Sequence, residues 1–160
     1  MIPSIEWTNN KVKMIDQTIL PHELKFLEFT DYRDVATSIK VMNIRGAPAI
    51  GVAAAMGMAL ATIEYKQLPK EKFNEKMEEA ANLIRSTRPT ASNLFWAVDR
   101  IWKIVSTYPD EPINISELVV WFLIKSVTVH GSLANFLIVI VFPLFEIGYE
   151  TALALSPVTK

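Results

Sequence analysis

The sequence predicts a mainly α-helical domain of the α+β class, in which a small N-terminal antiparallel β-sheet is followed by a helical bundle. Residues 5–14 alternate apolar and polar side chains, which indicates half-buried strands. Residues 31–105 instead repeat apolar side chains at helical spacing. Residues 49–61 are small and apolar on almost every side, which is typical of a helix at the centre of a bundle.

The strands are expected to come first. Residues 5–7 and 12–14 form two alternating runs, and Asn9 and Asn10 between them favour the tight turn of a β-hairpin. Leu20 and Pro21 end this unit, and residues 26–29 add a third strand.

The first two helices follow. Asp31 is in place to cap the first, whose apolar stripe consists of Val35, Ile39 and Met42 at i, i+4 and i+7. The second, central helix begins near Pro48 and runs to about Tyr65. It contains Gly51 and Gly57, and each glycine inside a helix costs about 1 kcal/mol relative to alanine. We therefore expect neighbouring helices to approach the central helix closely.

Two more helices complete the bundle. The third covers residues 70–86, with a charged, solvated face opposite an apolar stripe that consists of Phe73, Met77, Ala80, Ala81 and Ile84. The fourth opens after the Arg88-Pro89 loop and ends near Tyr108. Its buried stripe is expected to consist of Leu94, Val98, Ile101 and Val105.

Composition limits the functions open to the chain. A net charge of −1 and a pI near 6.1 do not favour nucleic acid or an anionic membrane as a partner. With no cysteine, the 160 residues hold no disulfide and no thiolate nucleophile. The histidines, His22 and His130, lack the spacing of a metal site. Residues 1–30 contain charges and no apolar run, so we expect no secretory signal and a cytoplasmic location.

The loop that opens the central helix is suited to an anion. Pro48 fits the first turn of a helix, and Gly46 allows a sharp bend or close approach to a ligand. Arg45 lies beside the helix N-terminus, where unpaired N–H groups and the helix dipole favour negative charge. A forked guanidinium there suits a phosphate. On this pattern alone, an ordinary helix start with a surface arginine stays open as the alternative.

A second loop repeats this design, since Arg88 and Pro89 precede the fourth helix. If the two helix starts converge, Arg45 and Arg88 make a two-arginine clamp for an anion, to which Thr87 and Thr90 can add hydroxyl donors. Convergence is a hypothesis at this point, because helical periodicity does not show which helix ends meet.

Three segments resemble the methylthioribose-1-phosphate isomerase family in order and spacing: residues 16–21 (DQTILP), 42–51 (MNIRGAPAIG) and 87–97 (TRPTASNLFWA). The resemblance covers about residues 1–108 and implies a cofactor-free aldose–ketose isomerisation of 5-methylthioribose 1-phosphate in methionine salvage. It also implies that Arg45, Gly46, Ala47 and Arg88 contact this phosphorylated sugar.

The chain departs from the family pattern beyond this region. The resemblance implies that a cysteine and an aspartate of a second, Rossmann-like domain do the chemistry, but the chain has no cysteine, and we assign it no catalytic residue and no second domain. It is therefore expected to keep the phosphate-binding half of the site and to be inactive alone. The alternative, suggested by the related regulatory subunits of the initiation factor 2 exchange factor, is a binding module without turnover, or one that forms a homodimer through its tail.

A divergent hydrophobic tail is expected over residues 109–160. Its sequence resembles the family only faintly, which is what a truncated or frameshifted gene would produce. The hypothesis that the chain is a gene fragment without a function of its own therefore also stays open. Residues 126–145 lack charged side chains and reach the length of a membrane-spanning helix, about 20 residues. Polar residues within them and Pro143 favour a buried tail or an exposed, aggregation-prone strand instead.

Overall fold

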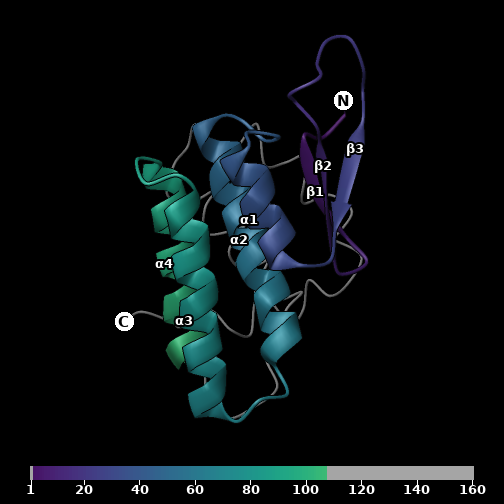
Figure 1. Cartoon of the computed structure of the whole chain (residues 1–160). Helices are drawn as coiled ribbons and strands as arrows, with labels where there is room; N and C mark the ends of the chain where they lie inside the picture. The colour runs from purple at the N-terminus through teal and green to yellow at the C-terminus, as the bar shows by residue number, and fades with distance from the viewer. Residues whose placement is uncertain (1, 108–160) are drawn as a thin grey trace, which may run out of the picture.

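The computed structural model describes residues 2–107 and contains three strands followed by four helices. Figure 1 shows the sheet packed beside the bundle. The elements are β1 (Ile5–Thr8), β2 (Lys11–Ile15), β3 (Phe26–Phe29), α1 (Tyr32–Lys40), α2 (Ala47–Tyr65), α3 (Lys70–Thr87) and α4 (Ser92–Thr107). The predicted order of a small sheet and then four helices is confirmed. The expectations about the tail, including residues 126–145 and His130, lie outside the described residues.

The predicted hairpin and third strand form one antiparallel sheet in the order β1-β2-β3. In the hairpin, Ile5 pairs with Met14 and Trp7 pairs with Val12. Asn9 and Asn10 both have positive φ, 51° and 59°, which is the geometry of a two-residue turn whose twist matches that of the strands. The inward side chains of β1 and β2 are buried, and both strands pack against α2.

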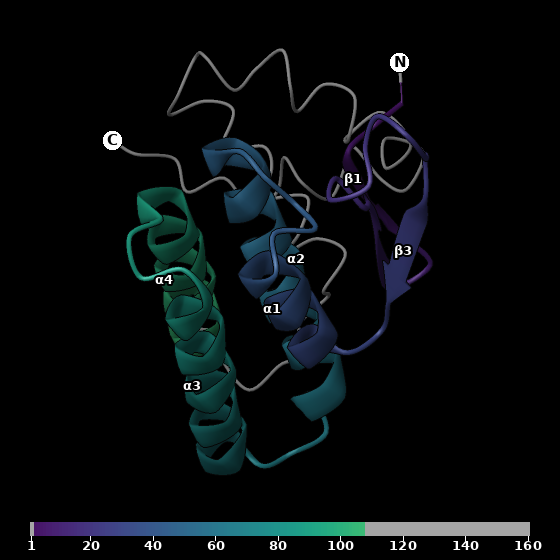
Figure 2. The ribbon, with the colours of Figure 1, turned by 45° about the horizontal axis from the view of Figure 1, so that its top comes forward.

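Helix α2 forms the centre of the molecule, as predicted. It packs against α1, α3 and α4 and against the sheet, and its residues from Ala49 to Thr62 are all buried. In Figure 2 it lies between the sheet on one side and the α3–α4 pair on the other. By length and composition α2 is apolar enough to cross a membrane, but 78% of that apolar window is buried inside the protein. Its uniform apolar character is thus explained by neighbours on every side.

The glycines of α2 mark the closest approaches of its neighbours. A Cβ on Gly51 would stand 3.1 Å from the backbone oxygen of Asn93, in the first turn of α4. A Cβ on Gly57 would stand 3.2 Å from Cδ1 of Ile84 and 3.4 Å from Cγ1 of Val35. The expectation that small residues admit close packing is therefore confirmed at both positions.

Helix α1 begins as predicted and ends earlier than its apolar spacing suggests. The Asp31 carboxylate caps it by accepting a 2.8 Å hydrogen bond from the Arg33 amide. Val35 and Ile39 are buried, but the prediction that Met42 continues their stripe is wrong, because Met42 lies beyond the helix and is 40% exposed. Its φ of +67° turns the chain away from the helix axis.

The stripes of α3 and α4 are confirmed, because all of their predicted members are buried. The two helices are also joined at their polar edges, where the Arg85 guanidinium donates to the Asp99 carboxylate. At the other side of the bundle, Arg33 of α1 makes a bidentate pair with Glu64 near the end of α2, with both distances at 3.0 Å. These contacts join α3 to α4 and α1 to α2 at the polar edges of the bundle.

Candidate anion-binding site

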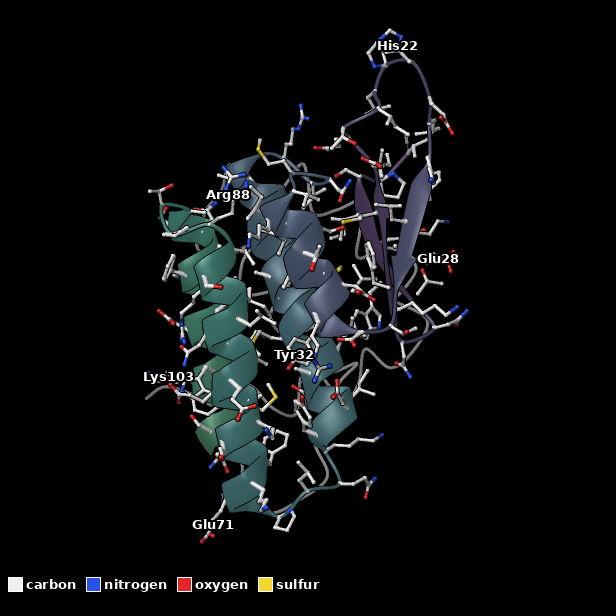
Figure 3. All side chains as sticks on the ribbon, in the orientation of Figure 1. His22, Glu28, Tyr32, Glu71, Arg88 and Lys103 are labelled. Carbon is white, nitrogen blue, oxygen red and sulfur yellow. The ribbon has the colours of Figure 1, made fainter. Side chains whose placement is uncertain are left out.

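The starts of α2 and α4 lie at the same end of the bundle. Gly51 and Asn93, which nearly touch, are both close to the beginning of their helices. Figure 3 shows Arg88 at this end, beside the start of α2, and Glu71 at the opposite end. The two loops that the sequence singles out are therefore neighbours in space, and the positive ends of two helix dipoles lie side by side.

The start of α2 presents uncapped backbone donors. Gly46 occupies the cap position, has no side chain and makes no capping hydrogen bond. Its φ of +91° is a conformation that other residues rarely adopt, yet a Cβ there would meet nothing within 4 Å. The requirement for glycine is thus conformational. The helix begins in such a way that the N–H groups of Gly46, Ala47 and Ala49 have no partner in the preceding turn, and Pro48 has no N–H to offer.

Arg45 lies at the exposed surface, directly before this helix start. Its backbone N–H donates to Oε1 of Gln17 at 2.7 Å. Its side-chain Nε donates to the carbonyl of Met42 at 3.3 Å. Both bonds restrict the residue without covering it, so that the guanidinium stays accessible to a ligand.

Met42 orients the carbonyl that Arg45 contacts. Its amide donates to Ile39 and the amide of Asn43 donates to Ser38, the paired bonds that end a helix when the residue after its cap is left-handed. Glycine or asparagine is usual at that position, and a methionine with positive φ stores strain there. The strain thus lies at the start of the segment that carries Arg45.

Replacing Met42 with glycine should relieve this strain. Since glycine adopts the observed φ freely, we expect Met42→Gly to raise the free energy of unfolding by about 0.5–1 kcal/mol. Urea denaturation of the two proteins measures the difference. A decrease in stability would show that contacts of the methionine side chain outweigh the backbone strain.

The segment that follows β2 is joined to the Arg45 loop by hydrogen bonds between side chains. Oδ1 of Asp16 accepts from the backbone N–H and the hydroxyl of Thr18 and, at 2.8 Å, from Nδ2 of Asn43. The hydrogen bond from the Thr18 hydroxyl, followed by that from Asn43, lowers the pKa of the Asp16 carboxyl below its usual value. Asp16 is therefore an ionised acceptor at neutral pH.

Arg88 ends α3 and begins the turn into α4, where its carbonyl accepts from the Ala91 amide at 3.0 Å. Its Nη1 atom is buried and, among residues 2–107, has no hydrogen-bond partner. Burying a charged donor without a partner is costly, about 1–3 kcal/mol or more. A hydrogen-bond acceptor brought to Nη1 would remove this cost.

The predicted hydroxyl donors are Thr87 and Thr90. The hydroxyl of Thr87 donates to the carbonyl of Ile84 at 2.6 Å, so its proton is used within α3. Since a hydroxyl proton makes one strong bond at a time, Thr87 would have to give up this bond to donate to an anion, and that role stays a prediction. Thr90 is exposed in the loop. No cluster of three or more metal-ligating side chains occurs in residues 2–107.

Sequence reasoning missed Asp16, Gln17 and Asn43 as parts of the site. They lie in the segments that carry the family resemblance, but we gave them no chemical role there. A local signal was present, because an Asp two residues before a Thr is typical of a turn closed by the side chain. The bonds from residues 43 and 45 back to residues 16 and 17 connect positions 27 and 28 residues apart, which no local pattern shows.

Known proteins are similar to this chain over the region that contains the candidate site. The model of the initiation factor 2 subunit family matches residues 43–128. A methylthioribose-1-phosphate isomerase of Geotalea uraniireducens is 49% identical over 111 residues, or 69% of this chain. A putative methylthioribose-1-phosphate isomerase of Pyrococcus horikoshii is 44% identical over 118 residues, or 73% of this chain. The chain spans about a third of the length of these curated relatives, 32% in both cases.

Two solved structures have folds similar to that of this chain. The 5-methylthioribose 1-phosphate isomerase from P. horikoshii matches 82% of this chain and 36% of its own, with a TM-score of 0.68 and 39% identity. Subunit delta of the translation initiation factor eIF-2B from A. fulgidus matches 78% of this chain and 36% of its own, with a TM-score of 0.67 and 35% identity. By fold, the chain is thus about as similar to subunit delta of eIF-2B as to the isomerase.

Proposed function

Because the chain belongs to the initiation factor 2 subunit family, we propose that it binds the phosphate of a phosphorylated sugar between the starts of α2 and α4. The sugar that we propose is 5-methylthioribose 1-phosphate, since the relatives with 44–49% identity are named for its isomerisation. The single observation that carries the proposal is the buried Nη1 of Arg88, which has no hydrogen-bond partner within residues 2–107.

Each proposed contact supplies a different part of the recognition. Arg88 contributes a guanidinium whose Nη1 atom is already desolvated on folding. Gly46 and Ala47 contribute backbone N–H groups at the positive end of α2. Arg45 contributes a second guanidinium at the exposed rim of the site. A phosphate carries enough acceptor oxygens to engage all of these groups together.

Turnover is a separate matter from binding. An aldose–ketose isomerisation moves a proton between two neighbouring carbons and needs a positioned acid or base. The family resemblance assigns the chemistry to a cysteine and an aspartate outside the matched region, and the 160 residues contain no cysteine. We therefore propose that this polypeptide supplies phosphate-binding residues of an isomerase site and does not isomerise the sugar alone.

The alternative function is a regulatory binding module. The likeness to subunit delta of eIF-2B, with a TM-score of 0.67, favours it about as strongly as the likeness to the isomerase favours an enzyme part. Such a module would bind a phosphate ester or a nucleotide and would have no preference for the methylthio group. Ligand preference therefore separates the two functions.

Isothermal titration calorimetry tests the proposal. We expect the full chain to bind 5-methylthioribose 1-phosphate, and to bind 5-methylthioribose without the phosphate at least about tenfold more weakly, since charge-assisted bonds to the phosphate carry the affinity. Equal affinities for the two sugars would contradict a phosphate site, and so would the absence of heat with the phosphorylated one. Tighter binding of a nucleotide than of the sugar phosphate would favour the regulatory module.

A further inference from the structure

The segment of residues 42–46 needs support from outside to hold one conformation. Met42 and Gly46, at its two ends, both have positive φ, and most of its residues are exposed or partly exposed. Only Ile44 is fully buried and anchors the segment in the core. A segment of this kind samples many conformations unless further bonds restrict it.

Gln17 restricts the segment on both sides of Ile44. Its backbone N–H donates to the carbonyl of Asn43 at 2.8 Å, and its side-chain Oε1 accepts from the amide of Arg45 at 2.7 Å. One residue thus fixes the positions immediately before and after the anchor. The second bond holds the backbone of Arg45, directly before the uncapped start of α2.

Asp16 and Ser38 orient the side chain of Asn43. The Asp16 carboxylate accepts from Nδ2 of Asn43 at 2.8 Å, while Oδ1 of Asn43 accepts from the Ser38 hydroxyl at 3.1 Å. Because an amide has distinct donor and acceptor ends, these two bonds allow only one orientation of the Asn43 side chain. The end of β2, the end of α1 and the Arg45 loop are thereby joined in one network.

We propose that Asp16, Gln17 and Asn43 are positioning residues, which hold Arg45, Gly46 and Ala47 in the geometry that binds the phosphate. The inference rests on the function proposed above and extends it to residues that do not contact the ligand. A loop ordered before binding loses little freedom when the ligand arrives, and the saved entropy strengthens binding. Loss of the network should therefore weaken binding in a protein that still folds.

Gln17→Met tests the proposal without any change of charge. The variant keeps the length of the side chain and removes the acceptor for the Arg45 amide. We expect about tenfold weaker binding of 5-methylthioribose 1-phosphate, since the loop must then be ordered on binding. Gln67→Met, in the α2–α3 turn, is the matched control and should bind as the wild type does.

Asn43→Asp tests the same network by charge repulsion. It places a second carboxylate against that of Asp16, whose Oδ1 is the atom that accepts from Asn43. We expect the variant to bind 5-methylthioribose 1-phosphate more weakly, because the loop is loosened and must be ordered on binding. Wild-type affinity in Asn43→Asp would contradict a positioning role for this pair.

Hydrogen exchange at the Arg45 amide, followed by NMR, keeps the test independent of ligand binding. In the wild type this amide should be protected by its bond to Gln17, and in Gln17→Met it should exchange at least about tenfold faster. Unchanged exchange in Gln17→Met would overturn the inference, and so would wild-type affinity in that variant. If the wild type binds no sugar phosphate, the proposed function fails, while the exchange rates still decide whether the network orders the loop.

Discussion

Replacing Arg88 with methionine should abolish most of the affinity for 5-methylthioribose 1-phosphate and leave the fold intact. The guanidinium holds a buried Nη1 without a hydrogen-bond partner among the described residues, so a phosphate would be its first partner. A hydrogen bond to a charged group contributes about 1.5–3 kcal/mol, which corresponds to roughly 10- to 150-fold in affinity. Calorimetric titration of Arg88→Met and of the wild type measures this loss.

Arg85→Met is the matched control for this experiment. Arg85 lies one turn earlier on α3, and its guanidinium already pairs with Asp99. Removing that partly exposed pair should cost about 0.2–1 kcal/mol of stability and should not change binding. Arg88→Met, by contrast, removes a guanidinium whose buried Nη1 has no partner among residues 2–107, and the variant should unfold no more easily than the wild type. Equal loss of affinity in both variants would mean that the effect is not specific to Arg88.

Alanine at Gly51 should be far more damaging than alanine at Gly57, although both positions lie within α2. Both substitutions gain about 1 kcal/mol of helix propensity. At Gly51 the new methyl group meets the backbone of Asn93 at 3.1 Å, and the first turn of α4 must shift to admit it. At Gly57 it meets the tip of the Ile84 side chain at 3.2 Å, which can rotate. We expect a net loss of about 1–3 kcal/mol for Gly51→Ala and a change near zero for Gly57→Ala.

Two measurements separate these effects. Urea denaturation gives the change in the free energy of unfolding for Gly51→Ala and Gly57→Ala. Titration with 5-methylthioribose 1-phosphate then reports on the site, because Gly51 lies where the two helix starts meet and Gly57 does not. A Gly51→Ala protein with wild-type stability and affinity would show that α4 moves without cost, and the close contact would not define the site.

The sequence predicts most of the fold because its signals are local. Asn9 and Asn10 favour the hairpin turn, Asp31 caps α1, and the stripes of α3 and α4 follow helical spacing. Met42 shows the limit of such reasoning. Its spacing from Val35 fits a helix face, but the helix ends at Lys40 in the paired hydrogen bonds of a left-handed cap. No sequence pattern indicates that a methionine will adopt a positive φ.

The candidate site is only partly predictable, for the same reason. Gly46 and Pro48 predict a helix start directly after Arg45, and Pro89 likewise predicts one after Arg88. Whether the two starts meet depends on how α2 packs against α4, and that contact involves a glycine and a backbone carbonyl instead of a recognisable pair of side chains. The bonds from Asp16 and Gln17 to the Arg45 loop likewise appear only once β2 and α1 are packed together.

The most direct test of the central claim is an NMR titration of the backbone amides with 5-methylthioribose 1-phosphate. The largest shifts should occur at Gly46, Ala47 and Ala49, where α2 begins without a cap, and at the first turn of α4. The Arg88 guanidinium signal should shift with them, and inorganic phosphate should produce the same pattern more weakly. Shifts confined to other surfaces, or an unperturbed α2 start at saturating ligand, would contradict a phosphate site between the two helices.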